Sequence, residues 1–202
     1  LSTSSFNEDI GAWDTSGVTA MDSMFHRAAA FDQDIGAWDT SGVQEMQQMF
    51  EEASSFNQDI GDWVVDKVTI MHGMFDSASS FNQNIGGWSV GQVTNMDTMF
   101  GQASSFNQDI SGWRVDQVVR MHWIFRDASA FNQDLGWCVD DDVDLGGHGG
   151  AFVNTLCEST SCGVLQMDNC PTPAPTTPAP TPAPSVQPTN GDCLEKITDF
   201  CS

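Results

Sequence analysis

The hydrophobic residues of this chain return at the same positions every 25 residues, with polar residues between them. A phenylalanine opens each repeat, an aliphatic residue follows four positions later, and a tryptophan stands three positions after that. The opening phenylalanines are Phe6, Phe31, Phe56, Phe81, Phe106 and Phe131. A 25-residue unit cannot bury so many large side chains alone, so we expect successive units to stack and to bury these columns against one another.

Two segments of each unit differ in hydrophobic spacing. From Val43 to Ala53 the apolar residues fall at i, i+3, i+6, i+7 and i+10, which predicts a helix of about three turns. From Phe56 to Trp63 the sequence FNQDIGDW hardly varies between units, which favours a short strand and a turn. The glycines that follow the strand predict a bend with positive φ: Gly11, Gly36, Gly61, Gly86 and Gly136.

These patterns predict an α/β repeat solenoid, leucine-rich-repeat-like, with a short strand and a short helix in each 25-residue unit. Residues 1–137 hold five full units and a partial sixth. Residues 138–170 are predicted to form a disulfide-stapled C-terminal cap, because terminal units of a stack must hide their last face from water. The chain begins inside a repeat without Met, so we expect it to be processed or partial.

Polar residues form two further columns. The first consists of Asn7, Asn57, Asn82, Asn107 and Asn132, with Asp32 in the remaining place. Stacked amides are expected to hydrogen-bond along this column. The second consists of Asp9, Asp34, Asp59, Asp109 and Asp134, with Asn84 in the fourth unit. Carboxylates about 4.8 Å apart repel one another, so these side chains are expected to cap turns or to share calcium ions, the single candidate cofactor.

The charge narrows the classes of function. The chain has 6 basic and 28 acidic residues and a formal net charge of −22, which excludes nucleic acid as a partner. No apolar run is long enough to cross a bilayer, so membrane insertion is not expected. The four histidines form no constellation with a nucleophile, and we expect no enzymatic activity.

Trp123 stands where other units carry Ser, Gln, Gly or Thr, and is expected to pack under the cap or to mark a contact patch.

All cysteines lie in the last third of the chain, at Cys138, Cys157, Cys162, Cys170, Cys193 and Cys201. An even number of close cysteines without zinc-type spacing predicts disulfides in an oxidising compartment. Three pairings are open for the first four; we favour Cys138–Cys157 with Cys162–Cys170, and Cys193–Cys201 in the tail. Four acidic residues at 140–144 could bind calcium, but a solvated loop is the preferred interpretation.

Residues 171–190 are rich in proline and threonine and predict an extended polyproline II linker. Its hydroxyl residues are candidate O-glycosylation sites: Thr172, Thr176, Thr177, Thr181, Ser185 and Thr189. Residues 191–202 form a short tail in which Leu194, Ile197 and Phe200 recur every third position. These three residues, together with Phe6 and Ile10 of the first unit, are the candidate assembly contacts.

The pattern FNQDIxxWxxxxVxxMxxMFxxA over residues 1–137 resembles the BspA-like surface-protein repeat, a leucine-rich-repeat-like unit of 25 or 26 residues. The resemblance implies a right-handed solenoid, an extracellular or surface-anchored location and roles such as adhesion; it brings no catalytic motif.

Together, these features lead us to expect an extracellular structural or adhesive protein that assembles with its own copies, head to tail, into a filament. The alternative is a calcium-dependent module that recognises a cell-surface protein or glycan.

Overall fold

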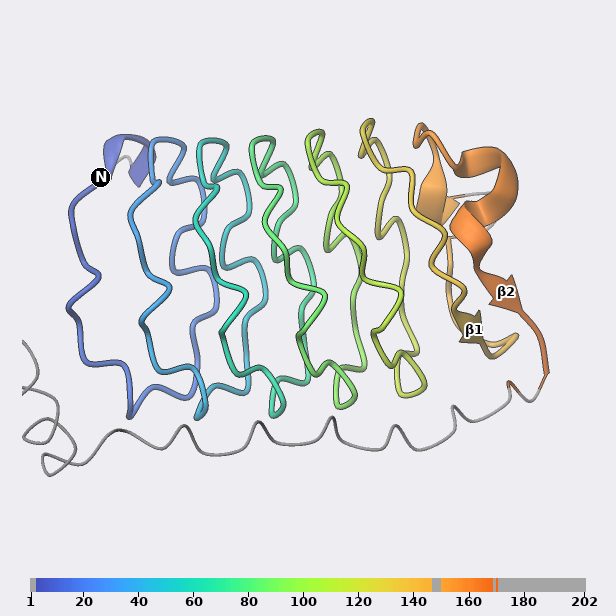
Figure 1. The fold of residues 1–202 in the computed structure, drawn as a ribbon, viewed down its shortest axis with the longest axis horizontal. Coiled ribbons are helices and arrows are strands. Elements are labelled where there is room, and N and C mark those ends of the chain that lie inside the picture. Colours follow the sequence, from blue (N-terminus) through green and yellow to red (C-terminus); the bar gives the residue numbers. More distant parts are fainter. Residues whose placement is uncertain (1–2, 147–149, 169, 171–202) are drawn as a thin grey trace, which may run out of the picture. The chain divides into compact units, whose positions relative to one another are not determined.

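The computed structural model describes residues 3–146, 150–168 and 170 (Figure 1). Leu1–Thr172 form one compact unit. Residues 173–202 lie outside the described residues. Described regular elements are short: the 3-10 helices η1 (Thr3–Ser5), η2 (Gly150–Phe152) and η3 (Glu158–Gly163), and the strands β1 (Cys138–Val139) and β2 (Leu165–Gln166). β1 and β2 pair in parallel, with Cys138 opposite Leu165.

Between residue 6 and the cap, the 25-residue units lie one upon the next in phase. Isolated parallel bridges join equivalent residues of neighbouring units: Ala20 to Glu45, Glu45 to Ile70, Ile70 to Asn95, Asn95 to Arg120, and Arg120 to Asp144. Figure 1 shows the successive loops side by side in sequence order. We propose that this arrangement is a repeat solenoid, and we refer to residues 6–130 as the stack.

Over the described residues 6–130, neither the helix nor the strand predicted for each unit is present, and this part of the prediction is wrong. Residues 43–53 form consecutive turns, because Gln48 and Glu52 have φ of 56° and 58°, and equivalent positions of the other units are also left-handed. Alternate amides bond to the next unit, as from Gln48 N to His72 O at 2.8 Å, while Met49 N bonds to Met46 O three residues back. Since every second amide is used between units, no α-helical series can form.

The glycine after the predicted strand is required by close packing. The φ of Gly61 is not positive, contrary to the prediction, and the same is true of Gly11, Gly36 and Gly86; only Gly136 has positive φ, at 58°. A Cβ at Gly61 would lie 2.7 Å from the carbonyl oxygen of Asn84 in the next unit, which is too close for any side chain. The stacking distance therefore selects glycine here.

The core consists of aromatic columns that run along the stack. Phe56 and Phe81 are fully buried, and their ring centroids are 5.9 Å apart in nearly parallel planes. Phe50 packs against Phe56 at 3.9 Å, so two phenylalanine columns interlock. Burial of a large apolar side chain contributes about 1.5–3 kcal/mol, and each unit repeats that contribution.

The tryptophans add a hydrogen bond to their apolar packing. In four units the indole Nε1 donates to the carbonyl oxygen of the isoleucine in the preceding unit, at 3.1 Å in each case. The pairs are Trp38 with Ile10, Trp63 with Ile35, Trp88 with Ile60 and Trp113 with Ile85. Trp137 breaks the series: it follows Trp113 by 24 residues, and its buried Nε1 has no hydrogen-bond partner among the described residues.

The disulfides of the cap differ from the favoured pairing, which is wrong. The structure joins Cys138 to Cys170 and Cys157 to Cys162. Cys157 and Cys162 meet because η3 turns back on itself at Ser161 and Cys162, which have φ of 50° and 48°. Cys138 lies on β1 beside β2, from which the chain continues to Cys170. The predicted Cys193–Cys201 bond lies outside the described residues.

Candidate functional site

The side chains of the asparagine column link successive units by accepting backbone N–H groups rather than by bonding to one another. The side-chain oxygen at this position accepts the backbone N–H of its counterpart in the next unit, as from Asn82 N to Asn57 Oδ1 at 2.9 Å. The same bond recurs, also at 2.9 Å, from Asp32 to Asn7, Asn57 to Asp32, Asn107 to Asn82 and Asn132 to Asn107. Hydrogen bonds along the column are therefore present as expected, but their donors are backbone N–H groups rather than the side-chain amides of the column itself, and they satisfy polar groups between units.

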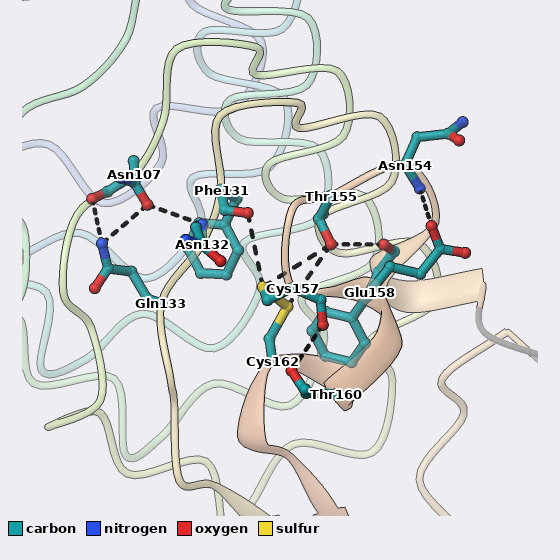
Figure 2. The surroundings of a disulfide bond; sticks show 11 residues. Asn107, Phe131, Asn132, Gln133, Asn154, Thr155, Cys157, Glu158, Thr160 and Cys162 are labelled. Atoms are coloured by element: carbon teal, nitrogen blue, oxygen red, sulfur yellow. Dashed lines mark hydrogen bonds between the residues drawn. A yellow bond between two sulfur atoms is a disulfide. The ribbon is translucent and has the colours of Figure 1, made fainter.

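In the second to sixth units a glutamine follows this position and strengthens the link. Gln133 Nε2 donates to both the backbone carbonyl and the Oδ1 of Asn107, at 2.8 and 2.9 Å. Figure 2 shows Asn107, Asn132 and Gln133 beside the Cys157–Cys162 disulfide, where the column reaches the cap. The column is therefore a part of the architecture, and its bonds all run in one direction along the stack.

The aspartate column lies at the turns, as the turn-capping interpretation predicts. Asp9, Asp34 and Asp59 each accept the backbone N–H two residues ahead through Oδ1, at 3.0–3.1 Å. Hydrogen bonds from the Ser111 side chain and backbone lower the pKa of Asp109. Asp134 differs, since it lies so close to Gly163 that a Cβ there would overlap its carboxylate.

The alternative role of this column in calcium binding stays a prediction. Within residues 3–146, 150–168 and 170, no group of three or more His, Cys, Asp or Glu side chains is arranged to hold a metal ion. One oxygen of Asp9, Asp34, Asp59 and Asp109 is already used at its own turn.

The first unit exposes residues whose counterparts are buried elsewhere. Met24 is 39% exposed, whereas Met49, Met74 and Met99 are completely buried. Trp13 is 54% exposed, against 4% for Trp38. Phe6 and Val18 are half-buried. We call the surface formed by Phe6, Trp13, Val18 and Met24 the N-terminal face.

Backbone acceptors accompany this face. In later units the carbonyl groups of Glu45, Gln47 and Met49 accept amides of the preceding unit at 2.9 Å. The equivalent carbonyls of the first unit belong to Ala20, Asp22 and Met24, and they have no backbone donor among the described residues. The N-terminal face thus combines apolar side chains with a row of open acceptors, as an unpaired strand edge does.

The opposite end of the stack is covered. Phe125 N donates to Ala151 O at 2.9 Å, Asp127 N donates to Val153 O at 2.8 Å, and the ring of Phe152 lies 6.0 Å from that of Phe125. The cap therefore supplies the acceptors and the apolar contacts that a further unit would supply.

Of the predicted assembly residues in the first unit, the structure exposes one and buries the other. Phe6 belongs to the N-terminal face, but Ile10 is 4% exposed and its side chain offers almost no accessible surface. Sequence reasoning missed Trp13 and Met24, although their position in the first unit could have indicated them. Leu194, Ile197 and Phe200, and the six O-glycosylation candidates from Thr172 to Thr189, lie outside the described residues.

Charged residues gather on the side of the stack. Asp97 is 4% exposed, and its carboxylate contacts Arg120 at 2.6 Å and accepts the backbone N–H of His122 at 2.9 Å. Burial and the neighbouring Glu51 carboxylate raise the pKa of Asp76 to about 6.

Trp123 is 37% exposed, and a Cβ at Gly150 of the cap would lie 3.1 Å from its indole, so it both touches the cap and faces solvent.

Comparison with known proteins gives one family. No helix in the described part of the chain is long and apolar enough to cross a membrane. No curated protein and no solved structure matches the chain. The family described as "Mycoplasma protein of unknown function, DUF285" matches residues 1–79 and again residues 59–145, which together cover the whole stack. The chain therefore belongs to the DUF285 family.

Proposed function

We propose that this protein is an extracellular structural or adhesive surface protein of the BspA-like type. It assembles head to tail into a filament, in which the N-terminal face of one copy receives the C-terminal tail of another. The single observation that carries the proposal is the exposure of Met24, at 39%, in a column whose next three members are completely buried.

The chemistry of the N-terminal face favours a peptide segment as its occupant. Such a segment would donate backbone N–H groups to the carbonyls of Ala20, Asp22 and Met24 while it covers Trp13 and Met24 with apolar side chains. This is the way in which extended peptides bind to an open sheet edge. Backbone bonds would supply affinity, and the side chains would set the register.

The sequence of the tail fits that role. Leu194, Ile197 and Phe200 supply apolar side chains, and the preceding linker of about 20 residues could extend by roughly 60 Å, enough to reach a neighbouring molecule. A head-to-tail contact joins two different surfaces of successive copies. Unless the rotation between successive copies closes a ring, such a contact generates a linear assembly. The disulfides and the net charge of −22 are consistent with an extracellular location.

The proposal is tested by the size of the assembly formed by the full chain. Sedimentation velocity and negative-stain electron microscopy of the oxidised protein should show oligomers that grow with concentration. Met24→Lys should abolish them, because a charge on the face would have to be buried without a partner. Val119→Lys, at a 57% exposed apolar residue of the fifth unit, is the matched control and should assemble normally.

A second variant tests the tail. Leu194→Ser combined with Phe200→Ser should prevent assembly as strongly as Met24→Lys. Assembly that survives this double change would show that something other than the tail occupies the face. If the full chain sediments only as a monomer at high concentration, the filament is excluded.

A further inference from the structure

One column of residues on the side of the stack has no side chain in the fourth unit, where it contains a glycine. The residues at this position in the first to fifth units are His26, Glu51, Asp76, Gly101 and Arg126. Gly101 therefore leaves a gap between an acidic and a basic side chain of the same column. Little space remains directly beside Gly101, because a Cβ at this residue would lie 3.0 Å from Asp76 Oδ1 and 3.3 Å from Thr98 O.

This gap opens into a pocket of about 160 Å³. The pocket is lined by Asp76, Thr98, Gly101, Gln102, Trp123 and Arg126. A volume of this size is well below that of a pocket for a drug-sized molecule, so it suits one small group. The side chains come from three successive units, and the register of the stack brings them together.

The basic wall of the pocket is fixed in place. The guanidinium carbon of Arg126 lies 4.6 Å from the ring centroid of Trp123, and Arg126 Nε contacts Asp127 Oδ2 at 3.2 Å. The indole is 37% exposed, whereas every other described tryptophan outside the first unit is at most 4% exposed. A guanidinium held on an aromatic ring loses little freedom when it binds a ligand.

The acidic wall is also fixed. The Ser77 hydroxyl donates to Asp76 Oδ1 at 3.3 Å, and the carboxylate is half-buried beside Glu51. Asp76 can only accept hydrogen bonds when it is ionised, and Arg126 can only donate them. Gln102 and Thr98 can do both. The lining thus offers acceptors on one side, donors on the other, and an apolar ring edge.

A free anion would be repelled by Asp76 and Glu51, and a cation would have to displace the Arg126 guanidinium from its place between Asp127 and the Trp123 ring. A neutral group with several hydroxyls meets neither penalty, because each hydroxyl both donates and accepts, and the C–H groups of a sugar can contact the exposed edge of the indole beside Arg126. We propose that this pocket binds a single neutral sugar residue of a glycan, with Asp76 accepting, Arg126 donating and the exposed edge of the Trp123 indole in contact with the sugar. This site is separate from the N-terminal face and does not depend on filament assembly.

The proposal is tested with a panel of methyl glycosides of glucose, galactose, mannose and N-acetylglucosamine, titrated into the oxidised full chain and followed by NMR. At least one glycoside should bind with a Kd in the millimolar range or below, as expected for one small ligand. Gly101→Ala should weaken that glycoside about tenfold or more, because the added methyl group occupies the floor of the pocket. Trp123→Gln, which copies Gln48 of the second unit, should weaken it similarly.

Two controls separate the pocket from general effects. Gly91→Ala adds a methyl group where nothing lies within 4 Å and should leave binding unchanged. Sodium acetate and methylammonium chloride should not compete with the glycoside.

The proposal is overturned if no glycoside binds at millimolar concentrations, or if Gly101→Ala binds as tightly as the natural sequence. It is equally overturned if acetate or methylammonium binds at the pocket while the glycosides do not. Circular dichroism of each variant verifies that the stack is intact, and Gly101→Ala keeps the test informative if Trp123→Gln unfolds.

Discussion

The first and fifth units of the stack place equivalent residues in opposite surroundings. Met24 of the first unit is 39% exposed, while Ile124 at the same position of the fifth unit is completely buried. Above the fifth unit, the cap provides Ala151 and Phe152, but no described residue covers the first unit in that way. The comparison shows that burial in this fold is decided by the neighbouring unit, because a single unit has the same columns wherever it stands.

The largest expected difference concerns the phenylalanine columns. Phe75→Ala removes a fully buried ring that packs at 4.0 Å on Phe81 and at 5.5 Å on Phe50, and it should lower the free energy of unfolding by about 3–5 kcal/mol. Phe6→Ala, in the half-buried first unit, should lower it by less than half as much. Urea unfolding followed by circular dichroism measures both, and equal losses would contradict the comparison.

The second difference lies within the cap. Cys138 and Cys170 are 32 residues apart, whereas Cys157 and Cys162 are 5 apart. In the chain-entropy treatment the longer loop stabilises by about 3–4 kcal/mol and the shorter by about 2 kcal/mol. Paired Cys→Ser variants of each bond should therefore melt at different temperatures, the Cys138/Cys170 pair lower. Scanning calorimetry gives the order, and a lower value for the short bond would refute it.

The tryptophans provide a third, smaller contrast. Trp113→Phe removes one of two donors to the Ile85 carbonyl, since the Trp88 backbone N–H still bonds to that oxygen at 3.1 Å, so the lost hydrogen bond costs about 0.5–1.5 kcal/mol beyond the lost packing. Trp137→Phe removes an Nε1 that has no hydrogen-bond partner in the described part of the chain, so it should lack this penalty. The difference between the two unfolding free energies isolates the hydrogen bond. If Trp137→Phe is the more destabilising change, the contrast fails.

The smallest effect depends on pH. Because the pKa of Asp76 is about 6 in the folded chain and 3.8 ordinarily, the folded state binds more protons between these values, and stability falls as pH rises from about 4 to about 6. Asp76→Asn should therefore stabilise the protein at pH 7 by about 1 kcal/mol, after allowance for solvent screening. Melting curves at pH 4 and pH 7 measure this, with Asp66→Asn on an exposed residue as the control.

The columns of the stack were readable from sequence because every buried position repeats. Phe56, Ile60 and Trp63 recur with the same spacing, and the structure buries all three. The local conformation was not readable in the same way. The spacing of Val43, Met46, Met49 and Phe50 suits a helix, but left-handed φ at Gln48 and bonds between units give consecutive turns instead.

The candidate sites depended on information that no single repeat contains. Disulfide pairing follows from the turn at Ser161 and Cys162, for which the sequence has no periodic signal. The pocket at Gly101 arises from residues 25 positions apart, so it becomes visible only when units are aligned and one column is seen to lose its side chain. Trp123 was recognised as unusual, but its contact with Arg126 required coordinates.

The asparagine column has a consequence for evolution of the molecule. Since each asparagine oxygen meets the amide of the residue 25 positions later, removal or duplication of a whole repeat would rejoin matching partners. A deletion of any other length would shift every later partner out of reach. Recombination can therefore remove or add whole 25-residue units of the gene. The length of the stack would change, while every contact between neighbouring units would stay the same.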